Sequence, residues 1–253
     1  EIYDEYGPAN LIIAANVIGH IPDILDVGKG IKKLLSRDGQ FVFEAVYLPD
    51  VLKNVAFDQL YDEHVFTFSA TAVINVFKQY DLELVKLEHQ HVHGGSMRFY
   101  LGHKGCHPVH HSVPEILQTE KNQGLDSFET YHSFKLAIEE IRHQLTSKIV
   151  QLNNLGASVI GYGATAKSTT ILNYCDLGPN HIKWIQDSTE EKQGLLSPGS
   201  HIPIVSQEIF RQYNPDYAVL FAWNHRAEIE EKEQRWRANG GKWITYVPRV
   251  TIE

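Results

Sequence analysis

One short segment crowds phenol, carboxylate and imidazole side chains together, between Gln59 and Ser69. It contains Tyr61, Glu63 and His64, which are able to donate a hydrogen bond, orient a neighbour and accept a proton. An imidazole titrates near neutral pH, and a nearby carboxylate can hold its tautomer, so the pair is suited to general base catalysis. Residue types alone also allow an aromatic connector whose polar atoms bond only to backbone.

A second imidazole, His20, lies in a loop that follows a predicted strand. A single histidine is more often packed or solvated than catalytic. Loops at strand ends commonly carry functional residues, so the position of His20 favours a functional role, but only modestly. We therefore keep His20 as a candidate beside His64.

A glycine-rich turn near the middle of the chain fits the pattern G-x-G-x-x-A between a strand and a helix. Such a turn lets backbone approach a phosphate at the helix N-terminus, and an acid after the next strand can accept from a ribose hydroxyl. The ligand could be a dinucleotide or the diphosphate of a nucleotide sugar, and a plain strand–helix turn is the alternative. The candidate binding residues here and at a later strand end are Gly161, Gly163, Thr165, Lys167, Ser168, Asp187, Asn224 and His225.

Histidines are dense between His89 and His111, and His89, His91 and His93 alternate along a predicted strand. A metal site would need a carboxylate or Cys at a defined spacing from them. A histidine-rich surface is the better interpretation, and we predict no metal site in this chain.

The elements that position these residues alternate between strand and helix, which predicts an α/β fold. A buried strand is expected over Asn10–Val17, then a helix over Asp23–Leu35 that closes at Ser36–Gly39, and a strand over Gln40–Val46. A short helix and a hairpin around Gly94 and Gly95 follow. A long amphipathic helix ending at Gly156 then precedes a second α/β unit, whose predicted strands are Val159–Gly163, Ile182–Gln186, Tyr217–Ala222 and Trp243–Val247.

Composition excludes several classes of protein. The 43% hydrophobic and 21% charged fractions are those of a soluble globular chain without a bilayer-spanning stretch. A net charge of -8 argues against a broad nucleic-acid-binding face, and two cysteines are too few for a disulfide framework. We expect a cytoplasmic protein that contacts neither membrane nor nucleic acid.

Four ordered segments together resemble the S-adenosylmethionine-dependent sugar C-methyltransferases, which act on thymidine-diphosphate keto-deoxysugars. These segments are Tyr61–His64, His93–Gly95, Gly161–Lys167 and Leu220–His225. The resemblance covers essentially the whole chain and implies that Tyr61, Glu63, His64 and His20 form the catalytic set. It also implies a thymidine-diphosphate sugar as ligand.

Members of that family are similar in having a zinc-binding N-terminal domain, a class I methyltransferase domain and a Rossmann-like C-terminal domain. The resemblance implies that residues 1–111 are the later part of a class I methyltransferase Rossmann sheet, 112–156 a helical linker and 157–253 a Rossmann-like nucleotide-sugar-binding domain. The chain starts at Glu1 without Met and has no Cys-x-x-Cys pair or glycine-rich cofactor loop before Leu11. We expect the zinc, and most of the S-adenosylmethionine site, to belong to a part of the enzyme outside this sequence.

The mechanism that the resemblance implies begins with removal of a proton next to the sugar ketone by His64. Glu63 orients that base or shares its role, and Tyr61 or His20 donates a hydrogen bond to the enolate oxygen. Two other functions stay open: a nicotinamide-dependent oxidoreductase, favoured by Gly161–Ala166 with Asp187, and a non-catalytic module that binds nucleotide sugar. The sugar, the carbon methylated and the oligomeric state are not indicated.

Overall fold

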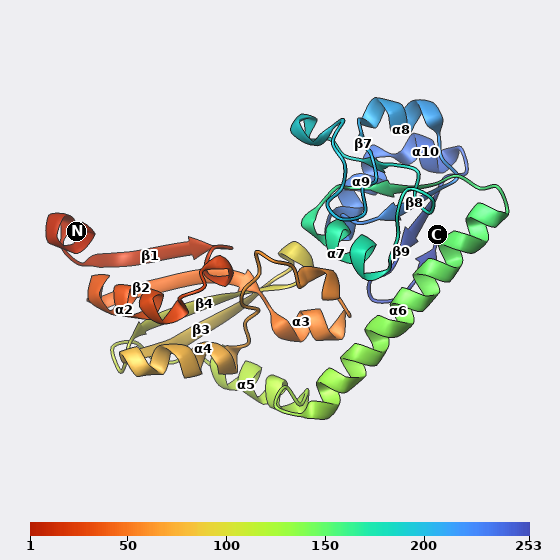
Figure 1. The fold of residues 1–253 in the computed structure, drawn as a ribbon. Coiled ribbons are helices and arrows are strands. Elements are labelled where there is room, and N and C mark those ends of the chain that lie inside the picture. The colour runs from red at the N-terminus through yellow and green to blue at the C-terminus, as the bar shows by residue number, and fades with distance from the viewer. The chain divides into compact units, whose positions relative to one another are not determined.

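The computed structural model describes all 253 residues, which divide into two compact units. Unit 1 comprises Glu1–Lys53 and Asp62–His132, and unit 2 comprises Asn54–Tyr61 and Ser133–Glu253. The short segment Asn54–Tyr61 thus belongs with the C-terminal half of the chain, although unit 1 flanks it in sequence. Both units are α/β, which confirms the predicted fold class (Figure 1).

Unit 1 is built on a four-stranded mixed sheet in the order β1-β2-β4-β3. Its first two strands, β1 (Ala9–Ala15) and β2 (Leu35–Val46), run parallel. The other two, β3 (Leu82–Gln90) and β4 (Ser96–His103), form the predicted antiparallel hairpin, and β4 pairs antiparallel with β2. The helices of this unit are α1 (Ile2–Tyr6), α2 (Ile24–Leu34), α3 (Leu48–Lys53), α4 (Ala70–Phe77) and α5 (Ser112–Asn122).

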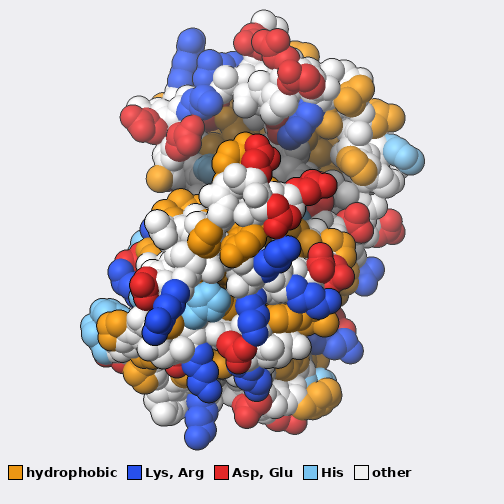
Figure 2. Space-filling view, turned by 90° about the vertical axis from the view of Figure 1, so that its left-hand side faces the viewer, with side chains coloured by type: hydrophobic (Ala, Val, Ile, Leu, Met, Phe, Trp, Pro, Cys, Tyr) orange, Lys and Arg blue, Asp and Glu red, His pale blue; other side chains and the backbone are white.

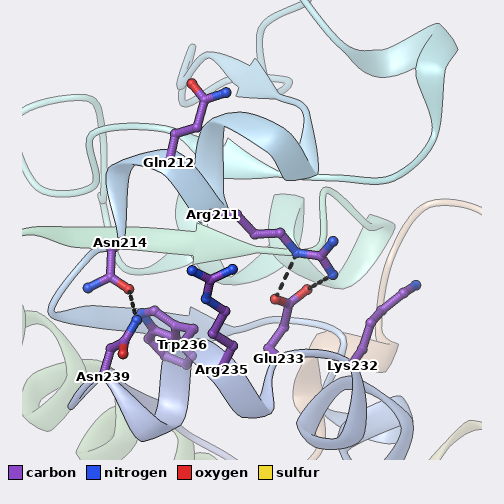
Figure 3. A pocket seen from close by; sticks show the side chains of 8 residues that line it. All are labelled: Arg211, Gln212, Asn214, Lys232, Glu233, Arg235, Trp236 and Asn239. Carbon is purple, nitrogen blue, oxygen red and sulfur yellow. Dashed lines mark hydrogen bonds and ion pairs between the residues drawn. The ribbon is translucent and has the colours of Figure 1, made fainter.

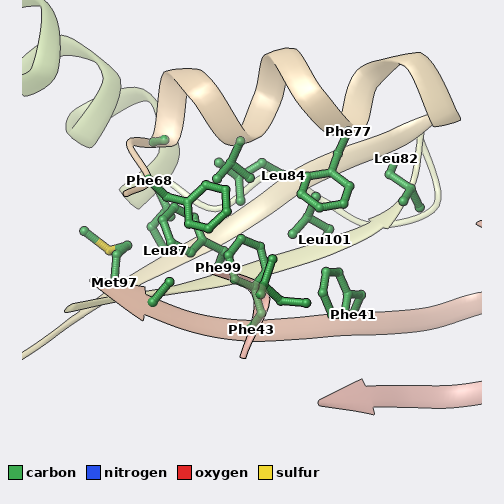
Figure 4. Packing of buried hydrophobic residues seen from close by; sticks show 14 of the residues in the cluster. Phe41, Phe43, Phe68, Phe77, Leu82, Leu84, Leu87, Met97, Phe99 and Leu101 are labelled. Carbon is green, nitrogen blue, oxygen red and sulfur yellow. The ribbon is translucent and has the colours of Figure 1, made fainter. Parts of the chain in front are cut away.

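Aromatic and aliphatic side chains from β2, β3 and β4 pack beneath α4 to form the core of unit 1 (Figure 4). Phe43 is its centre, with its ring 4.6 Å from that of Phe99 and 6.0 Å from that of Phe77. The alternation of buried and half-buried residues along β2 places these rings on one face of the sheet. The opposite face carries polar side chains, including Arg98, whose guanidinium lies 2.9 Å from the Glu44 carboxylate.

The first β-α-β stretch of this chain departs from the expected pattern at two points. Within these 253 residues β1 pairs only with β2 and lies at the edge of the sheet, with Leu11 55% and Ile13 69% exposed. The helix α2, capped by Asp23, does not close on Gly39, because the chain turns extended at Leu35 and enters β2 directly. Gly39 lies inside that strand, where a Cβ atom would come within 2.8 Å of the Ala9 carbonyl oxygen.

A buried carboxylate from α5 fastens the start of α4. Glu120 is 1% exposed and accepts hydrogen bonds from the Tyr47 hydroxyl at 2.8 Å and from the backbone N–H of Ala70 at 2.6 Å. Its second oxygen accepts from the Thr71 N–H and hydroxyl at 2.9 and 2.7 Å. A helix leaves its first N–H groups without internal partners, so Glu120 satisfies donors that would otherwise be buried and unpaired.

Substituting this carboxylate by its amide should therefore destabilise unit 1. In E120Q one set of donors faces an NH₂ group, and we expect a loss of about 2–4 kcal/mol in the free energy of unfolding. Urea denaturation measures it, with E115Q on the exposed side of the same helix as the control. Equal stability of E120Q and E115Q would contradict the assignment.

Unit 2 contains a six-stranded sheet in the order β10-β9-β8-β5-β6-β7. Five strands are parallel and only β10 (Thr251–Ile252) runs antiparallel. The parallel strands are β5 (Val159–Tyr162), β6 (Ile185–Gln186), β7 (Ile204–Val205), β8 (Tyr217–Leu220) and β9 (Lys242–Thr245). The order reverses between β5 and β8, because β6 and β7 extend the sheet on one side of β5 and β8 and β9 extend it on the other.

Helices pack on both faces of this sheet, as in a doubly wound fold. One core contains the stripe Ile141, Leu145, Ile149 and Leu152 of the long helix α6 (Phe128–Asn154), together with α7 (Ala166–Tyr174). The other core contains Phe210 of α8 (Gln207–Tyr213) and Trp236 of α10 (Gln234–Ala238), with α9 (Arg226–Lys232) beside them. Neither α6 nor any other helix has the length and apolar composition that crossing a membrane requires.

The surface shows a mixed distribution of charge. On the face drawn in Figure 2, Lys and Arg side chains are interspersed with Asp and Glu side chains and with hydrophobic ones. The net charge of -8 is therefore not gathered into a single acidic patch on this face.

Candidate functional site

The parallel strands β1 and β2 end at the same edge of unit 1, and both chemistry-bearing loops begin there. After β1, Asn16 takes a positive φ of 54° and a short 3₁₀ helix, Ile18–His20, follows. Beyond β2 the chain returns at Phe68, whose N–H donates to the carbonyl of Val46 at 3.3 Å. In an open α/β sheet this edge is where ligands bind.

Backbone contact between the two loops brings the imidazoles of unit 1 together. The Phe66 N–H donates to the Gly19 carbonyl at 3.0 Å, and a Cβ atom on Gly19 would stand 3.0 Å from the Phe66 carbonyl oxygen. The rings of His20 and His64 are 5.1 Å apart and edge-to-face at 79°. Together they line a small hollow of about 20 Å³ with Asn16, Gly19, Ala45, Val46 and Phe66.

The other two members of the predicted catalytic set are placed differently. Glu63 is exposed and does not line this hollow, although it directly precedes His64. Tyr61 is half-buried and belongs to unit 2. Unit 1 by itself therefore brings together only the two histidines, and the roles of Tyr61 and Glu63 stay predictions.

A second site lies in unit 2, at the carboxyl ends of the strands where the order reverses. A crevice of about 370 Å³ opens between the residues that follow β5, β6 and β8. Gly163, with φ of 93°, lies against Ala222 so closely that a Cβ atom there would stand 2.9 Å from the Ala222 Cβ. Ligands of doubly wound folds bind at this position in the sheet.

Half of the predicted binding residues line this crevice: Gly163, Thr165, Asp187 and His225. Thr165 caps α7, and its hydroxyl accepts from the Ser168 N–H at 3.2 Å. Asp187 accepts from the N–H groups of Ala164 at 2.7 Å and Thr189 at 2.9 Å. Asp187, which was predicted to contact a ribose, thus holds the glycine-rich turn in place. Fewer lone pairs of its carboxylate oxygens are then available to a ligand.

The remaining four predicted residues do not line the crevice. Gly161 is buried inside β5, where a Cβ atom would come within 2.6 Å of the Phe221 ring. Ser168 is buried and donates to the Thr165 carbonyl, and Asn224 lies half-buried beside His225. Burial lowers the pKa of the half-buried Lys167, while the neighbouring Asp58 charge raises it.

Sequence reasoning missed a cation that does line the crevice. Lys192 donates to the Ala164 carbonyl at 2.8 Å and lies 3.6 Å from the Asp187 carboxylate. Its side chain is half-exposed and borders the glycine turn from the side of β6. The available signal was a Lys five positions after the acid that follows the second strand.

A buried carboxylate that sequence reasoning also missed lies in the short segment assigned to unit 2. Asp58 is 0% exposed, and one oxygen accepts from the Trp223 indole N–H at 2.6 Å and the Tyr246 hydroxyl at 2.8 Å. Its other oxygen has no hydrogen-bond partner. Burial raises the pKa of Asp58, and the hydrogen bonds from Trp223 and Tyr246 and the charge of Lys167 lower it.

The Asp58 carboxylate also shifts the pKa of one of its hydrogen-bond donors, Tyr246. Burial raises the pKa of Tyr246 well above its usual range, and the neighbouring Asp58 charge raises it further. Phe57, next to Asp58, packs into the same core as α6 and α7. Asp58 therefore ties the chain just before Tyr61 to the strand ends of unit 2.

The histidine-rich region does not form one strand face as expected. β3 ends at Gln90, and His93 lies in a 3₁₀ turn with a positive φ of 55°. His89 pairs with Asp50 at 2.7 Å. No group of three or more His, Cys, Asp or Glu side chains is arranged to hold a metal ion.

Comparison with known proteins gives consistent matches. Residues 91–248 match the family model of the C-methyltransferase C-terminal domain, and residues 1–87 match a methyltransferase domain model. The C-methyltransferase NovU of Streptomyces niveus is 36% identical over 253 residues, which is 100% of this chain and 60% of NovU. The chain thus spans 60% of the length of this curated relative.

Among solved structures, an N-methyltransferase, NodS from Bradyrhizobium japonicum WM9, matches 38% of this chain and 51% of its own. The identity is 17% and the TM-score is 0.29. A TM-score this low does not establish a shared fold.

Proposed function

This chain belongs to the C-methyltransferase family, and we propose that it takes part in methyl transfer from S-adenosylmethionine to a carbon of a thymidine-diphosphate keto-deoxysugar. The observation that carries the proposal is the imidazole pair of His20 and His64 at the carboxyl ends of β1 and β2. Two loops separated in sequence converge there on side chains able to move a proton.

His64 is the base in this proposal. It takes a proton from the carbon next to the sugar ketone. The electron pair of the broken C–H bond forms the C=C bond of the enolate, and the π pair of the carbonyl moves onto the ketone oxygen. His20, with its ring 5.1 Å away, donates a hydrogen bond to that oxygen, and Tyr61 is a second candidate donor. Glu63 orients His64 or shares its role.

The cofactor fits only in part. A hollow of about 20 Å³ beside the imidazole pair is far smaller than S-adenosylmethionine, so unit 1 accounts only for the surroundings of the reacting atoms. When bound, S-adenosylmethionine supplies the electrophilic methyl group. The task of the residues in this chain is to create the nucleophilic carbon.

The crevice of unit 2 is the proposed site for the diphosphate. Its volume of about 370 Å³ lies within the usual range for small-ligand sites. Lys192 supplies a cation, and the N-terminus of α7 supplies N–H groups and the positive end of the helix dipole. His225, in the 3₁₀ turn that follows β8, also lines the crevice.

Two alternatives remain distinguishable. A nicotinamide-dependent oxidoreductase would need Asp187 for the ribose, but its oxygens already accept from Ala164 and Thr189. Calorimetric titration with nicotinamide dinucleotides against thymidine diphosphate separates these ligands. A non-catalytic module would bind the nucleotide sugar without activating its carbon.

Proton exchange tests the chemistry directly. The natural full-length protein, incubated in D₂O with a thymidine-diphosphate keto-deoxysugar and no S-adenosylmethionine, should place deuterium on the carbon next to the ketone faster than buffer alone does. Mass spectrometry and proton NMR follow the exchange, and adding S-adenosylmethionine should convert the sugar to its methylated product. Binding without exchange or methylation would leave only the non-catalytic module.

A further inference from the structure

A second hollow in unit 2 shares only Lys232 with the residues that line the proposed diphosphate crevice. It has a volume of about 430 Å³ and is formed by α8, the end of α9, and α10 (Figure 3). Its lining residues are Arg211, Gln212, Asn214, Lys232, Glu233, Arg235, Trp236 and Asn239. Three of these side chains are cationic and one is acidic, although the chain as a whole carries a net charge of -8.

The single acid of this hollow is already engaged by protein donors. Glu233 is 2% exposed and accepts from the Tyr162 hydroxyl at 3.0 Å and from the Gln207 amide. It also pairs with Arg211 at 3.4 Å. A buried carboxylate held by these donors cannot turn outward to neutralise the other cations. It fixes the Arg211 guanidinium at the wall of the hollow instead.

Of the two arginines that line the hollow, Arg211 pairs with Glu233 and Arg235 has no protein partner. Arg226 pairs with Glu230 and Glu253, and Arg237 donates to the carbonyls of Gly241 and Glu253. Arg235 forms no ion pair or side-chain hydrogen bond, and its guanidinium rises into the hollow beside Arg211 in Figure 3. A planar fork of N–H donors without an internal partner is suited to binding a phosphate with two oxygens.

The remaining lining residues suit the rest of such a ligand. Asn239 donates its amide to the Asn214 Oδ1 at 3.3 Å, and the remaining polar atoms of these two amides can donate to and accept from hydroxyl groups. Trp236 also lines the hollow, and its side chain is fixed because it is buried and donates its indole N–H to the Pro215 carbonyl at 2.6 Å. The volume is that of a small-molecule site.

From these observations we propose that this hollow binds the phosphate group of a small hydroxylated molecule, such as a sugar phosphate, between Arg211 and Arg235. The hollow is separate from the proposed base, since neither His20 nor His64 lines it. Lys232 borders both this hollow and the crevice at the strand ends, and contributes charge to each.

Phosphate binding is the test, with variants that separate the two sites. The natural full-length protein is titrated with inorganic phosphate and with a hexose 1-phosphate by calorimetry, at constant ionic strength set with chloride. We expect saturable binding of both, weakened about tenfold or more in R235Q, which corresponds to about 1.4 kcal/mol. R249Q removes the same charge from an exposed position outside the hollow and should bind like the wild type.

Further arms identify the ligand and the location. If the hexose phosphate binds more tightly than inorganic phosphate, and N239A lowers only the affinity for the hexose phosphate, the ligand contains a sugar. Equal affinities would identify phosphate itself as the ligand. K192Q alters the crevice but not the hollow. Three results would each overturn the proposal. One is loss of binding in K192Q with no loss in R235Q, another is an equal loss in R235Q and R249Q, and the third is the absence of saturable binding.

Discussion

H64Q in the natural full-length protein is expected to lower the turnover number about 10²–10⁴-fold, the usual contribution of a positioned general base. Glutamine keeps the size and polarity of the side chain but cannot accept a proton at neutral pH. The C–H bond next to the ketone would then be broken without a base. Deuterium exchange from D₂O into the sugar should fall by a similar factor, because it reports the same proton transfer.

Nucleotide-sugar affinity should hardly change in H64Q, since the proposed diphosphate site is made by residues of unit 2. A lower turnover at unchanged dissociation constant is the signature of a group that acts on the transition state. The neighbouring variant H20Q should lose less, because it removes a hydrogen-bond donor and leaves the base in place.

The matched control is H143Q, which changes an exposed histidine on α6. It should retain wild-type turnover and exchange. Turnover of H64Q within about threefold of the wild type would exclude His64 as the base.

D58A is expected to produce the largest loss of stability, roughly 2–5 kcal/mol in the free energy of unfolding. Asp58 is fully buried, and its removal leaves the Trp223 indole N–H and the Tyr246 hydroxyl without their acceptor. The Lys167 ammonium also loses the negative charge that it faces. Urea denaturation followed by tryptophan fluorescence measures the change.

The second variant, D58N, separates charge from shape. Burial raises the native pKa of Asp58, so the native state holds this proton more tightly than the unfolded chain does. The corresponding stabilisation is present at acid pH and is lost as pH rises through the native pKa. The amide side chain of D58N has no such proton to release, so the stability of D58N relative to the wild type should improve with rising pH.

D62A, which removes an exposed carboxylate four positions along, is the control and should be close to wild type in stability. If D58A unfolds at the same urea concentration as D62A, the hydrogen bonds of Asp58 do not hold this segment. A stability difference between D58N and wild type that is flat with pH would instead show that burial does not shift the Asp58 pKa.

Local patterns in the sequence predicted several elements of both units. The stripe Ile141, Leu145, Ile149 and Leu152 predicted α6, and its side chains are buried as that spacing requires. The glycine-rich turn predicted a strand, a helix and an acid after the next strand, and the structure has these in order at β5, α7 and Asp187. Such patterns are readable because each depends on residues within one or two turns or along a single strand.

Burial of a strand could not be read in the same way. Within these 253 residues β1 pairs only with β2, so the apolar run Leu11–Ala15, which is typical of a central strand, lies at the edge of the sheet. The glycine stop at Gly39 failed for a related reason. The chain around it pairs with β1, and that pairing overrides the local tendency of the Ser36–Gly39 segment to turn.

The candidate sites divide along the same line. Residue types and strand-end positions in the sequence were sufficient to select His20, His64, Gly163 and Asp187. Only the tertiary structure decided that the two imidazoles meet, that Lys192 and not Lys167 borders the crevice, and that Asp58 joins Trp223 and Tyr246. These contacts join residues up to 188 positions apart in the sequence. The spacing of residues within one helix or strand cannot predict such contacts, because they form only when the whole chain folds.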